Sequence, residues 1–147
     1  MVCSQIIAAT KFKEETRSEA IELILAIGEA KKAEIRKLAE IKTMFFPALL
    51  QMMTEVDHKD DLAAWTTDEE DELTKVDPSS TASAAISRLS SVLGGKATVA
   101  LTDAHIMNFI KSSDWTHRYV GLLCIGMVAE YTKDVMNKDA PMQSMLK

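Results

Sequence analysis

The fold is decided by the stretch DWTHRYVGLLCIGMVAEY, which runs from Asp114 to Tyr131. Asp114 is a good helix N-cap because its carboxylate can accept hydrogen bonds from the unpaired amides of the first turn. No charged residue follows between Tyr119 and Ala129. This apolar run is too short to cross a bilayer and too apolar for a helix covered on one side. It therefore predicts a helix that neighbours bury on two sides.

The same pattern occurs earlier in the chain, so the sequence contains an internal repeat. The residues Arg17, Ala20, Ile21, Ile24, Ile27 and Glu29 stand at the same mutual spacings as Arg118, Gly121, Leu122, Ile125, Val128 and Glu130. A weaker copy, formed by Ala85, Ile86, Leu89 and Val92, lies 36 residues before the last one. A period of this length built from two helices is typical of HEAT and armadillo solenoids.

We therefore expect an all-α fold, a HEAT-repeat superhelix fragment of about three repeats. The expected divisions are a partial repeat over residues 1–30, a repeat over 31–95 with an acidic insertion at 56–77, a repeat over 96–131, and the start of another at 132–147. Both ends are apolar rather than polar caps. We expect an internal piece of a longer array, able to self-associate through its uncovered ends.

The apolar pattern predicts helices over residues 3–10, 17–30, 34–55, 78–93 and 99–111, besides the one that Asp114 opens. Ile27 is expected on the buried face of the helix that starts at Arg17. Pro47 lies inside the predicted helix 34–55 and must bend or break it, and outer HEAT helices often carry a proline at a bend. Asp77 followed by Pro78 predicts a helix start, and Gly94-Gly95 predicts its end.

Negative charge is concentrated in one segment, although the net charge of the chain is only -5. From Glu55 to Asp77, both included, ten acidic residues stand against two lysines, and no helical or strand period is present. We expect a loop with some disorder. Trp65 is costly to leave in water, so it should anchor the loop on its scaffold or on a partner; a solvated linker is the alternative. The acidic charge argues against a direct nucleic-acid partner.

The residue types of enzyme and metal sites do not occur at the required spacings, so we expect no enzyme activity, no metal and no cofactor. Cys3 and Cys124 are expected to be reduced, buried thiols. Arg17 and Arg118 could bind a ligand, but we favour a structural ladder in which they, with Glu29 and Glu130, link adjacent repeats.

Several motifs in a fixed order resemble the karyopherin-β (importin-β) nuclear transport receptors, and within them the importin five type, also called karyopherin beta three. The motifs are IKTMFFPALLQMMTEVD (41–57), Trp65 in the acidic segment, SRLSSVLGGK (87–96), HIMNFIKSSDW (105–115), and Arg118-x-x-Gly121-Leu122 with Ala129-Glu130. Any one of these motifs alone would be weak, whereas their order is specific. The sequence departs from the family at Ala100, where a proline is common.

The resemblance implies a fragment of a receptor that moves between cytoplasm and nucleus and binds Ran-GTP, basic cargo proteins with nuclear-localisation signals, and Phe-Gly nucleoporins, with no membrane partner. Contact with Ran or basic cargo is expected from Asp57, Asp60, Asp61, Trp65, Asp68, Glu69, Glu70, Asp71 and Glu72, because carboxylates on a tether attract basic surfaces. The alternative is a HEAT-repeat scaffold or adaptor with no link to Ran.

Overall fold

The computed structural model describes residues 2–56 and 77–136; residues 1, 57–76 and 137–147 lie outside the described part. The described residues form helices and no strand, which confirms the predicted all-α class. The elements are α1 (Val2–Ala8), α2 (Glu14–Ala30), α3 (Lys32–Ile35), a π-helical turn η1 (Ile41–Phe45), α4 (Phe46–Met53), α5 (Pro78–Leu93), α6 (Gly95–Ile110) and α7 (Trp115–Met136). None of these helices is long and apolar enough to span a membrane.

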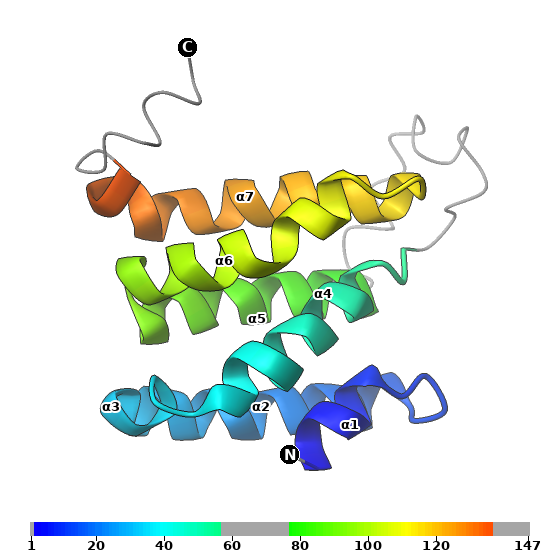
Figure 1. The fold of residues 1–147 in the computed structure, drawn as a ribbon. Coiled ribbons are helices and arrows are strands. Elements are labelled where there is room, and N and C mark those ends of the chain that lie inside the picture. Colours follow the sequence, from blue (N-terminus) through cyan, green and yellow to red (C-terminus); the bar gives the residue numbers. More distant parts are fainter. Residues whose placement is uncertain (1, 57–76, 137–147) are drawn as a thin grey trace, which may run out of the picture.

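The described helices pack as stacked pairs in two layers (Figure 1). The pairs are α1 with α2, α4 with α5, and α6 with α7. In one layer α1 contacts α4, and in the other α5 lies between α2 and α7 and contacts both. Each pair therefore packs mainly on its neighbour, which gives an extended core rather than a closed bundle.

The core follows the apolar positions of the repeat. On α2, Ile21 and Ile24 are 1% and 4% exposed, and on α5 the matching Ile86 and Leu89 are 0% and 2% exposed. The segment of η1 and α4 supplies the largest fully buried side chains, including Phe45, Phe46, Leu49 and Leu50. Six of the eight residues of α4 are buried, because α1, α5 and η1 all pack against it.

The start of α5 is fixed by the predicted signal. The Asp77 carboxylate accepts a hydrogen bond from the Ser80 amide at 2.6 Å, and the Asp77 amide donates to the Ser80 hydroxyl at 3.2 Å. Together they form a capping box with Pro78 in the first turn, so the predicted N-cap is confirmed.

The end of α5 is confirmed as well. Gly94 has a φ of +78°, a conformation that other residues rarely adopt, and its amide donates to the Ser90 carbonyl at 2.9 Å. The next helix begins at Gly95 itself, earlier than the predicted start at Val99. Gly95 is required there because a Cβ would lie 2.8 Å from the carbonyl oxygen of Tyr131.

The predicted continuous helix over residues 34–55 is wrong. The short helix α3 ends at Ile35, and the chain turns before helical structure resumes ahead of η1. Helical structure then continues through Pro47 without a break. Because Pro47 has no amide N–H, the helix widens just before it, and the Phe46 amide donates to the Ile41 carbonyl five residues earlier.

Two predictions of burial are also wrong. In α7 the stripe Val120, Cys124 and Val128 is buried, but Leu122 is 64% and Ile125 38% exposed. The helices α5 and α6 cover one side of α7, and no described element covers the other. Ile27 on α2 is likewise 51% exposed rather than buried.

Candidate functional site

The predicted partner-binding segment can be followed only at its two ends. Its residues Asp57, Asp60, Asp61, Trp65, Asp68, Glu69, Glu70, Asp71 and Glu72 all lie outside the described residues. Glu55 precedes this segment and Asp77 follows it, and both are described. Their contacts show how the scaffold holds the acidic segment at its base.

The first end is held by a buried arginine. The Arg17 guanidinium donates to both Glu55 carboxylate oxygens at 2.7 Å each, and its Nε donates to the Ile7 carbonyl at 2.8 Å. The side chains of Arg17 and Glu55 are 4% and 27% exposed. A two-pronged, charge-assisted contact of this kind is strong and directional. It joins α1, α2 and the end of α4 immediately before the acidic residues.

The second end is held by hydrogen bonds at the start of α5. Besides the capping box of Asp77, the Ser79 hydroxyl donates to the Met53 carbonyl at 3.0 Å, which ties the start of α5 to the end of α4. The chain therefore leaves the scaffold beside one ordered contact and returns beside another. The C-terminal ends of α1, α4 and α6 lie along the same edge of the molecule as these contacts (Figure 1).

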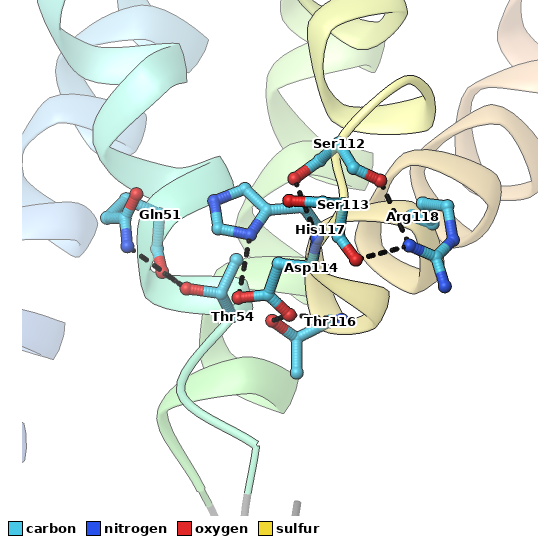
Figure 2. Close-up of polar contacts among 8 residues, drawn as sticks. All are labelled: Gln51, Thr54, Ser112, Ser113, Asp114, Thr116, His117 and Arg118. Carbon is cyan, nitrogen blue, oxygen red and sulfur yellow. Dashed lines mark hydrogen bonds and ion pairs between the residues drawn. The ribbon is translucent and has the colours of Figure 1, made fainter.

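The neighbouring turn between α6 and α7 is closed by its own polar groups (Figure 2). The Asp114 carboxylate accepts hydrogen bonds from the Thr116 amide at 2.9 Å and the Thr116 hydroxyl at 2.8 Å, and these bonds lower the pKa of Asp114. This confirms Asp114 as the predicted N-cap. Arg118 donates to the carbonyls of Ser112 and Ser113 at 2.9 and 2.8 Å. The polar groups of this turn thus stabilise the turn itself.

Of the four residues predicted to form a ladder, two contact the next helix pair and two do not. Arg17 and Glu29 both reach the next helix pair, Arg17 through Glu55 and Glu29 through Arg88. Arg118 instead contacts its own turn, and Glu130 is exposed on α7. A ladder role for Arg118 and Glu130 stays a prediction.

Sequence reasoning missed Arg88 on α5, which donates to Glu22 at 2.6 Å and to Glu29 at 3.1 Å. Glu22 and Glu29 are two helical turns apart on one face of α2, and that spacing could have indicated a shared basic partner. The contacts are exposed, so each adds about 0–1 kcal/mol and mainly fixes the register of α2 on α5.

His105 was also missed. Since the Phe46 amide donates to Ile41 and Pro47 has no amide, the Lys42 carbonyl lacks its usual helical donor. The Nε2 atom of His105 on α6 lies 2.9 Å from that carbonyl oxygen. His105 therefore satisfies the acceptor that the π-helical turn exposes, and no sequence motif would have indicated this pairing.

An open groove of about 340 Å³ lies between α1 and the segment of η1 and α4. Its lining is mostly apolar and consists of Ser4, Gln5, Ala8, Thr43, Met44, Pro47, Ala48 and Gln51. The Ser4 hydroxyl is buried beside the groove and has no hydrogen-bond partner among the described residues. Within residues 2–56 and 77–136, no group of three or more His, Cys, Asp or Glu side chains could hold a metal ion.

Comparison with known proteins identifies the architecture. Solved structures of the karyopherin Kap121p have 25% sequence identity to this chain. The structure of Kap121p bound to RanGTP matches 95% of this chain and 14% of the Kap121p chain with a TM-score of 0.81. The structure of Kap121p bound to Nup53p matches 92% of this chain and 13% of the Kap121p chain with a TM-score of 0.79. The match confirms the predicted HEAT-repeat solenoid and shows that this chain spans about one seventh of Kap121p.

A family model described as an importin repeat matches residues 9–100, from the α1–α2 turn to the first turns of α6. The match includes α2, α4 and α5 and both ends of the acidic segment. Since it covers more than half of the sequence, the chain belongs to the importin-repeat family of karyopherins.

Proposed function

We propose that this chain is part of a nuclear import receptor of the importin five type, which binds basic cargo and Ran-GTP and moves between cytoplasm and nucleus. Its role is binding rather than catalysis. Kap121p, which it resembles, has been solved in complex with RanGTP, with Pho4p and with Nup53p. The observation that carries the proposal is the importin-repeat match across residues 9–100, which spans the acidic segment and its attachment points.

In this proposal the acidic segment contributes to contact with Ran or basic cargo. The eight carboxylates that lie between Glu55 and Asp77 raise the local concentration of basic ligands and speed their encounter. The Arg17–Glu55 pair and the Asp77 capping box support the proposal, because they attach both ends of the segment to the packed helices. A tether fixed at both ends loses less entropy on binding than a free tail does.

The test is to neutralise the acids Asp68, Glu69, Glu70, Asp71 and Glu72 to the corresponding amides and to titrate Ran-GTP and a lysine-rich cargo peptide. We expect affinity for at least one ligand to fall about tenfold at low salt and by less at high salt, because screening weakens the wild-type contact. The matched control neutralises exposed acids outside the segment, namely Glu15, Glu19, Glu34 and Glu40.

Equal affinities for the variant and the wild type would leave the acidic segment without this role. A wild-type chain that binds neither ligand at either salt concentration would favour the scaffold or adaptor interpretation. The control variant separates a local effect of the segment from a general effect of net charge.

We propose the groove between α1 and α4 as the contact for Phe-Gly nucleoporin repeats. Its apolar lining suits a phenylalanine ring. A Phe-Gly peptide should bind the wild type, and a Ser-Gly peptide should not. The exposed Ala8 can be changed to glutamine to fill the groove; unchanged Phe-Gly binding by Ala8→Gln would place that contact elsewhere.

A further inference from the structure

The described helix pairs meet at two junctions that are built differently. The first junction joins α1 and α2 to α4 and α5, and the second joins α4 and α5 to α6 and α7 (Figure 1). At the first junction both layers are packed, because α1 contacts α4 and α2 contacts α5. At the second junction α5 contacts α6 and α7, whereas neither η1 nor α4 packs on α6 to a comparable extent. The second junction is therefore packed mainly along α5.

Arginine side chains cross the first junction at separate points. The buried Arg17 of α2 pairs with Glu55, which follows α4, at 2.7 Å. Further along α2, Glu22 and Glu29 pair with Arg88 of α5 at 2.6 and 3.0 Å. The first contact lies near the start of α2, and the second spans its middle and end. Charge-assisted contacts of arginine are directional, so they oppose a change in the angle between the two helix pairs.

A third arginine holds the far end of the first junction. Arg36, directly after α3, donates to the Val92 carbonyl of α5 at 2.9 and 3.1 Å. A Cβ at Gly28 of α2 would lie 3.3 Å from Val92 Cγ1, so α2 and α5 approach closely there. Since the polar contacts are spread along the whole of α2 and beyond it, the first two helix pairs are held as one unit.

At the second junction a histidine links the layer of α4 to α6. The Nε2 atom of His105 on α6 lies 2.9 Å from the Lys42 carbonyl oxygen in η1. The His105 ring also packs on the Phe46 ring, with 5.7 Å between the ring centroids. Because η1 and α4 pack little on α6, this side chain is the principal restraint on the distance between them.

In the other layer the second junction is held by apolar packing. The Ser83 hydroxyl donates to the Met127 sulfur, a weak acceptor, at 3.2 Å, and the Thr98 hydroxyl makes a long contact of 3.4 Å with the Ser90 carbonyl oxygen. Within residues 2–56 and 77–136, no ion pair joins α4 or α5 to α6 or α7. Apolar packing is non-directional, so it holds α5 and α7 together without fixing the angle between them.

The helices α6 and α7 are in close contact with each other. A Cβ at Gly95 of α6 would lie 2.8 Å from the Tyr131 carbonyl oxygen, and a Cβ at Gly121 of α7 would lie 3.0 Å from Ile110 Cγ1. Gly95 and Ile110 are the first and last residues of α6, so the close approach extends over its length. Any movement at the second junction therefore carries α6 and α7 together.

We propose that the bending of this helix stack is concentrated at the second junction. The pair of α6 and α7 rotates as a unit about the line where α5 packs on α7, and the contact of His105 with η1 limits this rotation. The first junction stays fixed, because rotation there would break the arginine contacts. Small sliding movements of packed helices are one of the common forms of conformational change. The proposal rests on contacts within the stack and is independent of cargo or Ran binding.

Distances between pairs of nitroxide spin labels, measured by pulsed electron spin resonance, test this difference. Cys3→Ser removes the half-buried thiol, and the buried Cys124 stays unlabelled. We expect the distance distribution across the second junction to be about twice as broad as that across the first, because apolar packing leaves the angle free. The labels replace exposed residues, namely Glu19 on α2 with Ser91 on α5 for the first junction, and Ala84 on α5 with Glu130 on α7 for the second.

Variants at each junction separate the two sets of contacts. His105→Ala should broaden the second distribution further and leave the first unchanged, whereas His105→Gln should restore the wild-type breadth, since its amide can donate to the Lys42 carbonyl. Arg36→Met/Arg88→Met should broaden the first distribution and leave the second unchanged. The matched control Lys37→Met removes an exposed positive charge beside Arg36 and should change neither.

Equal breadths across the two junctions of the wild type, or a broader distribution across the first, would overturn the proposal. A second distribution that His105→Ala leaves unchanged would overturn the role of the histidine contact. These measurements need no ligand, so their outcome is separate from the titration of the acidic segment that tests the proposed function.

Discussion

The ion pair between Arg17 and Glu55 can be tested by removing the charge of one partner at a time. In Glu55→Gln the shape is kept, but the Arg17 guanidinium, in a residue only 3% exposed, loses its counter-ion. Leaving a buried charge unpaired costs about 3–5 kcal/mol. Since Glu55 is 27% exposed, water compensates in part, and we expect a loss of about 2–3 kcal/mol of unfolding free energy.

The change Arg17→Met should lower the free energy of unfolding by less than Glu55→Gln does. Methionine fills much of the arginine volume and carries no charge, while Glu55 can turn to water. The Ile7 carbonyl loses its donor, which costs about 1–2 kcal/mol. The double variant should be about as stable as Arg17→Met alone, because Glu55→Gln has little left to disrupt once the arginine is absent.

Urea unfolding followed by far-ultraviolet circular dichroism measures these differences as shifts of the midpoint at unchanged slope. Glu19→Gln is the matched control, because Glu19 is an exposed acid on the same helix and should change stability by less than about 0.5 kcal/mol. The reasoning would be refuted if Glu55→Gln were no more costly than this control. It would also be refuted if Arg17→Met were the more damaging of the two changes.

Further changes test packing, burial and capping. In Gly95→Ala a Cβ would lie 2.8 Å from a carbonyl oxygen of α7, so urea unfolding should show that the free energy of unfolding falls by about 1–3 kcal/mol. In Gly126→Ala the Cβ meets nothing within 4 Å, so the free energy of unfolding should rise by about 0.5–1 kcal/mol. Equal effects of the two changes would contradict the packing. Burial raises the pKa of Cys124 to about 12, so a thiol reagent at mildly alkaline pH should label half-buried Cys3 first and Cys124 only on unfolding; two fast thiols would contradict this. Hydrogen bonds lower the pKa of Asp114, so its carboxylate stabilises the fold above the unfolded pKa of about 3.9, and this contribution is lost as the pH falls through the lower folded value. Asp114→Asn should therefore lower the Tm at neutral pH and approach the wild type in acid, and a gap that widens in acid would reverse the assigned sign.

Features set by local bonds could be predicted from the sequence. The start of α5 depends on Asp77 and Ser80, which are three residues apart, and its end depends on the backbone freedom of Gly94. Asp114 opens α7 in the same way. The internal repeat predicted the stacking of helix pairs, because equivalent apolar positions need equivalent neighbours.

Features set by tertiary contacts could not be predicted. The apolar positions from Glu34 to Glu55 follow one helical period, yet the chain turns after α3. The Arg36 side chain donates to the Val92 carbonyl at 2.9 and 3.1 Å, a contact 56 residues away in sequence that holds this turn against the end of α5. Hydrophobic periodicity cannot predict such a contact, because it indicates which side chains share a helix face and not which carbonyl groups lie near them in the fold.

The candidate site shows the same division. Composition located the acidic segment, because a dense run of carboxylates is visible in any sequence. The attachment of its first end is only partly predictable: the sequence indicates Arg17 as a residue that links repeats, but its acidic partner is Glu55, 38 residues further on. Any of the acids nearby could have been that partner, and only the packing of α1, α2 and α4 selects one.

The two ends of the acidic segment are held by different kinds of interaction, so they depend on different helices. The Asp77 capping box belongs to α5 alone and persists as long as that helix does. The Glu55 contact depends on a buried guanidinium that α1, through the Ile7 carbonyl, also helps to orient. Loosening α1 therefore weakens the hold on the first end of the segment and leaves the second intact, so the segment is attached to the scaffold asymmetrically.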